Sequence, residues 1–121
     1  MPKLKVYNFI DVVINEHTVL QPDIAIACNT DNKQFLDTPP TLVAEILSPS
    51  TALKDRHVKY DLYEQMGVAW YLIIDMDKEM VEIYRLIAGV YQAITQQPGE
   101  PFTLALADEC TLTLDWSAIW Q

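Results

Sequence analysis

The sequence predicts one domain of the α/β or α+β class, in which a twisted mixed central sheet carries one principal helix. The chain has 121 residues and half of them are apolar, so a hydrophobic core can form. Short runs rich in β-branched and aromatic residues recur between turn-forming residues, as is typical of strands. Residues 52–66 predict the helix, with Ser50 or Thr51 as its N-cap and Gly67 as its terminator.

The first half of the chain predicts three strands. Residues 5–14 and 19–28 form the first two, and Pro22 marks an edge or a bulge near the start of the second. Residues 29–40 are polar and end in two prolines, which is typical of a loop. Residues 41–47 (TLVAEIL) are apolar on both faces, so we expect a central strand that is covered on both sides.

The second half adds a buried strand, a hairpin and a short tail. Residues 70–75 (WYLIID) predict the buried strand, and residues 80–86 and 90–95 predict the hairpin. After a loop, the tail predicts short strand-like or helical pieces. Because an uncovered strand edge can pair with another strand, we expect the hairpin to be a dimer edge.

Composition narrows the class of protein. The net charge is −9, from 17 acids and 8 bases, which argues against a general nucleic-acid coat because phosphate affinity comes largely from Lys and Arg. A metal site is compatible with this balance, since it needs clustered carboxylates. The sequence contains neither a membrane span nor a signal peptide, so we expect a soluble cytoplasmic protein. Cys28 and Cys110 are expected to be ordinary thiols.

The predicted helix carries charges on its apolar side. The apolar arc of the helix is marked by Val58, Leu62, Tyr63 and Met66. Asp55 and Lys59 both fall inside this arc, and their i, i+4 spacing makes them neighbours. A charge pair directed at the sheet is costly unless something there needs it. The simpler alternative is an intrahelical ion pair at the edge of the apolar stripe.

Two predicted strands also carry a carboxylate where an apolar residue is expected. Glu45 lies on one face of the central strand, where it should be paired, protonated or bound to a metal. Asp23 shares a face with Ala25 and Ala27, which are small enough to let another group approach. Alternatively, Glu45 is a purely structural partner of Lys59, and Asp23 is a turn or strand-edge residue.

Asp23, Glu45 and Lys59 together suggest a site for metal-assisted hydrolysis. Two carboxylates on adjacent strands can hold Mg²⁺, which prefers oxygen ligands and keeps several waters. A nearby lysine can orient or deprotonate the attacking water and stabilise charge on phosphoryl oxygens. This is the minimum apparatus for phosphodiester hydrolysis. Lys54 and Arg56 flank the site and are candidates to contact a phosphate backbone, although two bases make a thin patch.

The residues in this region also resemble a known family. Pro22-Asp23, the run EILSPST at residues 45–51, Asp55 and Lys59 resemble the Uma-type endonuclease family of the PD-(D/E)xK, restriction-endonuclease-like superfamily. The resemblance implies a restriction-endonuclease-like core and a metal-dependent DNA endonuclease. It also implies Mg²⁺, with Mn²⁺ as a substitute, and a homodimer.

The resemblance assigns roles to individual residues. Asp23 and Glu45 would be metal ligands, with the Ile46 carbonyl as a third, and Ser48 would support the site through hydrogen bonds. The superfamily usually has lysine two residues after the second acid, where this chain has Leu47. In the Uma-type branch this function moves to the helix, which implies Lys59.

One departure from the family opens a second hypothesis. Members of the family are longer, with an N-terminal helix and strand. Residues 1–121 would then be a single restriction-endonuclease-like domain that lacks the family's N-terminal helix. The alternative function is therefore a catalytically degenerate nuclease-fold module that acts in dimerisation or regulation.

Overall fold

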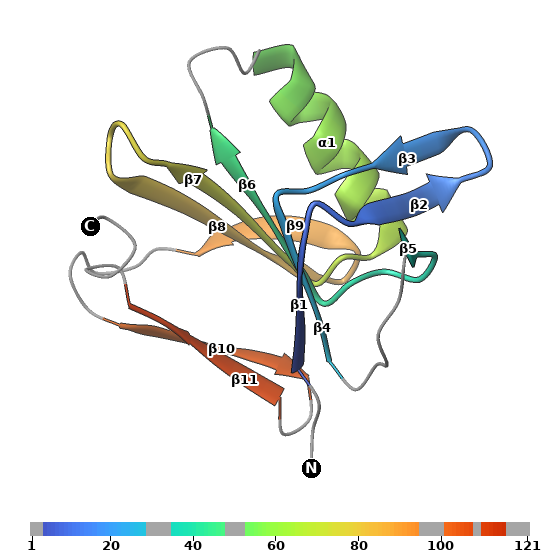
Figure 1. Cartoon of the computed structure of the whole chain (residues 1–121). Coiled ribbons are helices and arrows are strands. Elements are labelled where there is room, and N and C mark those ends of the chain that lie inside the picture. Colours follow the sequence, from blue (N-terminus) through green and yellow to red (C-terminus); the bar gives the residue numbers. More distant parts are fainter. Residues whose placement is uncertain (1–3, 29–34, 48–52, 95–100, 108–109, 116–121) are drawn as a thin grey trace.

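A six-stranded mixed sheet forms the centre of the fold (Figure 1). The computed structural model describes residues 4–28, 35–47, 53–94, 101–107 and 110–115, with only the backbone for residues 53–56 and 107. The strand order is β1-β4-β6-β7-β8-β9, and β6 and β7 are parallel whereas the other neighbours are antiparallel. The strands are β1 (Leu4–Asn8), β4 (Ile24–Cys28), β6 (Leu42–Leu47), β7 (Trp70–Asp75), β8 (Met80–Ile87) and β9 (Val90–Ile94).

Each face of this sheet is covered by different elements. The helix α1 (Leu53–Met66) covers one face, together with a three-stranded sheet of β3 (Thr18–Leu20), β2 (Asp11–Asn15) and β5 (Phe35–Leu36). A hairpin of β10 (Phe102–Ala107) and β11 (Cys110–Leu114) covers the other face. The predicted fold class, a twisted mixed sheet with one principal helix, is confirmed.

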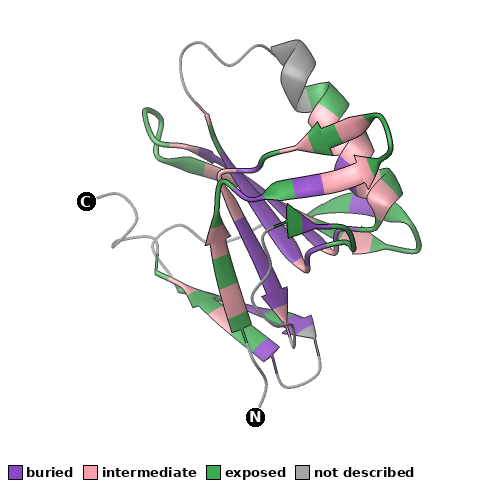
Figure 2. Ribbon diagram, turned by 45° about the vertical axis from the view of Figure 1, so that its right-hand side comes forward, coloured by how far each residue is buried: buried purple, intermediate pink, exposed green. Residues whose placement is uncertain are grey.

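The alternation of side chains along β6 and β7 produces two separate apolar cores. Leu42 and Ala44 face the hairpin, whereas Val43 and Tyr71 face the helix. Figure 2 shows that the central strands are buried along most of their length, as the sequence predicts for β6 and β7. The hairpin-side core consists of Ile26, Leu42, Ala44, Trp70, Leu72, Ile74, Ile83, Leu104, Leu106 and Cys110.

The first two predicted strands are each broken in two. Phe9 has a left-handed backbone (φ 56°), so the predicted strand of residues 5–14 turns there, and its halves join different sheets as β1 and β2. The Phe9 amide still donates to the Asp23 carbonyl at 3.2 Å. Pro22 lies between β3 and β4 and cannot donate a ladder hydrogen bond. Within the predicted loop, β5 pairs with β2 in parallel.

The helix ends where the sequence predicts. Gly67 has φ 96°, a conformation that costs glycine little because it has no Cβ. The amides of Gly67 and Val68 both donate to the Tyr63 carbonyl at 3.1 Å. This termination turns the chain directly into β7, so the end of the helix that carries Tyr63 is tied to the central sheet. The predicted N-caps, Ser50 and Thr51, lie outside the described residues.

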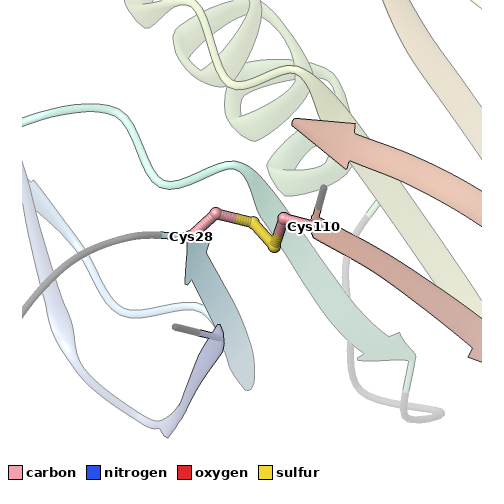
Figure 3. The surroundings of a disulfide bond; sticks show 2 residues. All are labelled: Cys28 and Cys110. Carbon is pink, nitrogen blue, oxygen red and sulfur yellow. A yellow bond between two sulfur atoms is a disulfide. The ribbon is translucent and has the colours of Figure 1, made fainter. Parts of the chain in front are cut away.

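The expectation of two ordinary thiols is wrong. A disulfide joins Cys28, at the end of β4, to Cys110, at the start of β11 (Figure 3). Two cysteines separated by 82 residues give no local pattern that would predict this pairing. Because disulfides persist mainly in oxidising compartments, the bond is an observation against the cytoplasmic location, which stays a prediction. No helix in the described ranges is long and apolar enough to cross a membrane.

Candidate functional site

The site begins where β4 and β6 stop pairing. Their ladder ends at the pair Ile24 and Ala44, so Asp23 and Glu45 are the next residues beyond the last pair, one beside each strand. There the Asp23 side chain replaces the missing ladder partner, because its Oδ2 accepts a hydrogen bond of 2.6 Å from the Ile46 amide. Asp23 is therefore held beside the backbone that carries Glu45.

Glu45 is buried and held by two side chains of the helix. Of the described residues, it is the one buried charged side chain, with 7% of its surface exposed. Its Oε2 lies 3.6 Å from Lys59 Nζ, and its Oε1 accepts a hydrogen bond of 3.1 Å from the Tyr63 hydroxyl. Lys59 and Tyr63 are four residues apart, so one helical face presents both to the sheet.

The surroundings of Glu45 disfavour its negative charge. Burial raises the pKa of the Glu45 carboxyl above its ordinary value, and the nearby charge of Asp23 raises it further. The Lys59 ammonium and the Tyr63 hydroxyl lower that pKa but only partly offset the burial. A carboxylate in this condition gains from a second positive charge. The surroundings of Glu45 therefore favour its protonation or a further positive charge beside it.

Tyr63 contributes a polar group to the site that the sequence did not predict. Its ring is fully buried, which agrees with its predicted place in the apolar arc, but its hydroxyl reaches Glu45. Burial and the adjacent Glu45 carboxylate both raise the pKa of the Tyr63 hydroxyl, so it remains a hydrogen-bond donor at neutral pH. The i+4 spacing from Lys59, which places both side chains on one helical face, is the sequence feature that could have identified Tyr63.

The structure brings together Asp23, Glu45 and Lys59, the three residues predicted to form the centre. Ile46, whose carbonyl was the expected third ligand, lies on β6 directly after Glu45. Ser48 lies outside the described residues. Lys54, Asp55 and Arg56 belong to the first turn of α1, but their side chains are also outside the described part of the chain.

The donor set fits a hard divalent cation. Within the described ranges, no group of three or more His, Cys, Asp or Glu side chains could hold a metal ion. The expected ligands, two carboxylates and the Ile46 carbonyl, would be a smaller, all-oxygen set of the kind that suits Mg²⁺, which keeps several waters. Each carboxylate oxygen has two lone pairs, so Asp23 and Glu45 retain acceptor positions beyond their present hydrogen bonds.

A mixed central sheet with one principal helix, whose lysine approaches a buried acid of the sheet, is the arrangement that the resemblance to Uma-type endonucleases implies. The chain belongs to the Uma2 family, whose model, described as "Putative restriction endonuclease", matches residues 5–115. The crystal structure of "a putative nuclease belonging to DUF820" from Anabaena variabilis has a TM-score of 0.73. It aligns with 97% of this chain and 68% of that chain at 17% identity, which shows a shared fold.

Two relatives from Synechocystis are similar in sequence. The uncharacterized protein sll1609 is 30% identical over 93 residues, which cover 73% of this chain and 52% of that protein. The uncharacterized protein slr1290 is 32% identical over 76 residues, which cover 60% of this chain and 40% of that protein. The chain thus spans about half the length of these relatives.

Proposed function

We propose that the chain is a metal-dependent endonuclease module that hydrolyses phosphodiester bonds of DNA. The observation that supports this most is the approach of Lys59 to Glu45, at 3.6 Å, beside the tethered Asp23 carboxylate. Burying a carboxylate and directing an ammonium at it is costly for stability. An active centre that needs both charges accounts for this cost, and membership of the Uma2 family is consistent with it.

In this proposal, Asp23, Glu45 and the Ile46 carbonyl hold Mg²⁺, for which Mn²⁺ can substitute. The bound cation supplies Lewis-acid stabilisation of the phosphoryl oxygens and makes water more acidic. Tyr63 fixes the Glu45 carboxylate through its hydrogen bond, and the Ile46 amide fixes Asp23. Both ligands are thus oriented before the cation binds, which reduces the entropy lost on binding.

Lys59 is the proposed residue that positions the attacking water. Its side chain is 34% exposed, so Lys59 lies against Glu45 while part of its side chain remains accessible to solvent. From this position it can hold the attacking water by a hydrogen bond and then stabilise negative charge on the phosphoryl group. We also propose that Lys54 and Arg56 contact the phosphate backbone, because a chain of net charge −9 has few other bases for this role.

Nicking of supercoiled plasmid in Mn²⁺ tests the activity. Lys59→Gln should lower the rate about 100-fold or more, as expected for the loss of one electrostatic contact to the transition state. Lys78→Gln is the matched control, because Lys78 is exposed in the turn after β7. If Lys59→Gln nicks DNA as fast as Lys78→Gln does, the proposed centre is wrong.

Cation binding is tested separately by thermal unfolding. Mn²⁺ should raise the melting temperature of the wild-type chain, because a ligand that binds only the folded state stabilises it. Asp23→Asn and Glu45→Gln should each lose most of this shift, whereas the exposed Asp77→Asn should retain it. A shift that is equal in all four proteins would place the cation elsewhere.

A second candidate is a catalytically degenerate module for dimerisation or regulation. One observation favours it: β9 is an edge strand of the central sheet, and Val90 on it is 56% exposed. An edge of this kind can pair with a second copy of the chain. Sedimentation of the wild-type chain beside Val90→Lys would detect such a homodimer. Mn²⁺-dependent nicking would exclude the degenerate module whether or not the chain is dimeric, whereas a dimer without Mn²⁺-dependent nicking would leave only the second candidate.

A further inference from the structure

A pocket of about 330 Å³ lies beside the proposed catalytic centre. Among the described residues, its lining consists of His57, Tyr60, Ile73 and Tyr84. Its size falls in the range of about 300–1,000 Å³ that is typical of small-ligand sites. The lining is mostly aromatic, with polar atoms at the tips of the rings, so the pocket suits a flat group that has a polar edge.

The sheet register places this pocket one strand from Glu45. Ile73 on β7 is the direct partner of Glu45 on β6, so both side chains lie on the helix-covered face. On α1, His57 and Tyr60 lie on either side of Lys59 in the sequence. Asp23 lies on the other side of Glu45, directly before β4. A substrate group in the pocket would therefore adjoin the centre on its β8 side.

The chemistry of the pocket favours a nucleobase over a phosphate. Tyr60 and Tyr84 meet edge to face, with ring centroids 5.2 Å apart and an interplanar angle of 90°, so they form two perpendicular aromatic walls. Glu82 is not one of the lining residues, but it is the partner of Ile73 on β8, so it puts a negative charge beside the pocket in the same row of the sheet. A carboxylate repels a phosphate but accepts hydrogen bonds from the exocyclic amino group of a base.

We propose that this pocket binds an unpaired nucleobase next to the phosphodiester that is cut. The inference rests on the proposed nuclease function and specifies its substrate. A base inside a duplex is stacked on its neighbours, so it can stack on the aromatic walls of this pocket only from a single strand or a bulge, or after flipping out. The module therefore acts on DNA that contains an unpaired nucleotide in preference to a perfect duplex.

Equilibrium binding of the wild-type chain to three labelled DNAs tests the inference. The DNAs are a perfect duplex, the same duplex with one unpaired nucleotide, and the bulged duplex with an abasic residue at that position. Binding is measured by fluorescence anisotropy in Ca²⁺. The unpaired base should bind about 5- to 100-fold more tightly than the abasic residue, which is the range of base–aromatic stacking.

The outcomes separate the two proposals. Equal affinity for the base and the abasic residue overturns the pocket inference and leaves the nuclease proposal intact. Absence of binding to all three DNAs contradicts the nuclease proposal itself, and the inference fails with it. Because this arm uses the unmodified protein, a folding defect cannot explain either result.

A pair of variants then locates the effect. Tyr84→Leu should reduce the preference for the base at least fivefold, whereas Tyr84→Phe should keep it because the stacking ring remains. Thermal unfolding of both variants checks that they fold. If Tyr84→Leu does not fold, His57→Ala gives the same reading from an exposed position on the pocket wall. A preference that is unchanged in the folded variant means that the base binds elsewhere.

Discussion

The two faces of the central sheet differ in what covers them and in what they bury. The hairpin face is apolar throughout its core, and the Cys28–Cys110 disulfide bonds its cover to the sheet. The helix face buries Glu45 and several tyrosines whose hydroxyls need partners. Strand β6 contributes to both faces, because Ala44 and Glu45 are adjacent but point in opposite directions.

This difference indicates that one face of the sheet supplies stability and the other face holds the candidate site. Burying a carboxylate on the helix face lowers stability, whereas burying apolar side chains on the hairpin face raises it. The hairpin face can therefore offset the cost of the polar groups opposite it. Substitutions on the hairpin face should change stability and leave the site intact, and substitutions around Glu45 should change the site with smaller effects on stability.

The largest expected effect comes from the disulfide. Replacing both cysteines, Cys28→Ala with Cys110→Ala, should lower the free energy of unfolding by about 4 kcal/mol, because the bond closes a long loop in the unfolded chain. Urea unfolding with and without dithiothreitol measures this. The double variant is its own control, since reductant should not affect it. A wild-type midpoint that reductant leaves unchanged would show that the thiols are not paired.

The next effect is loss of packing under the hairpin. Leu104 is fully buried, so Leu104→Ala should cost about 3 kcal/mol through lost burial and the cavity that remains. Met80 is 58% exposed, and Met80→Ala should cost less than about 0.5 kcal/mol. Chemical denaturation gives both values, and the Mn²⁺ response should survive in each variant. A loss of that response in Leu104→Ala would couple the two faces and contradict their independence.

A smaller effect is expected from the hydroxyl that holds Glu45. Tyr63→Phe keeps the ring but removes the hydrogen bond to Oε1, which should cost about 1 kcal/mol. The pKa of Glu45 should rise further, because this bond favours the charged carboxylate. Mn²⁺ binding, measured by calorimetry across a pH series, should therefore require a higher pH than it does in the wild type.

Tyr91→Phe is the matched control for that variant. The Tyr91 hydroxyl is also buried on the helix face, but it donates to the Val68 carbonyl at 2.7 Å instead of to Glu45. Its loss should cost a similar free energy without moving the pH dependence of Mn²⁺ binding. Equal pH profiles for the two variants would remove Tyr63 from the site.

The smallest expected effect is the pH dependence caused by Glu45. Its pKa in the folded chain lies above the ordinary value of 4.5, so between these two values the folded chain binds more protons than the unfolded chain. The free energy of unfolding should fall as pH rises through that window. Glu45→Gln has no such proton to lose, so it should gain stability relative to the wild type as pH rises above 4.5.

Urea unfolding at a series of pH values measures this relative gain. The exposed Glu16→Gln is the control, and its pH profile should follow that of the wild type. A Glu45→Gln profile parallel to the wild type would mean that the carboxyl does not change its ionisation on folding. Catalytic activity should be lost in Glu45→Gln, so this variant would gain stability and lose function together.

Much of this arrangement could be predicted because hydrophobic periodicity is a local property. The helical period placed Lys59 on the inner side of α1, and alternation identified β6 as a strand covered on both faces. The role of Tyr63 was missed because a tyrosine in an apolar arc looks like core, and periodicity does not indicate where its hydroxyl points.

The other features that differ from the prediction depend on contacts between distant parts of the chain. The turn at Phe9 was not predicted, because phenylalanine rarely adopts a left-handed backbone and the surrounding run reads as one strand. The parallel pairing of β5 with β2, and the pairing of Cys28 with Cys110, both depend on which segments meet in the folded chain. Neither has a signal within a short window of sequence.

The bond between Cys28 and Cys110 also has a topological consequence. It makes the backbone between them a closed covalent ring, with Glu45 and Lys59 on the ring and Asp23 on the tail before it. A protease that nicks the ring once leaves both pieces attached to each other. Such a nicked chain would separate into fragments on a denaturing gel only after reduction, and its folded halves would stay at high local concentration until then.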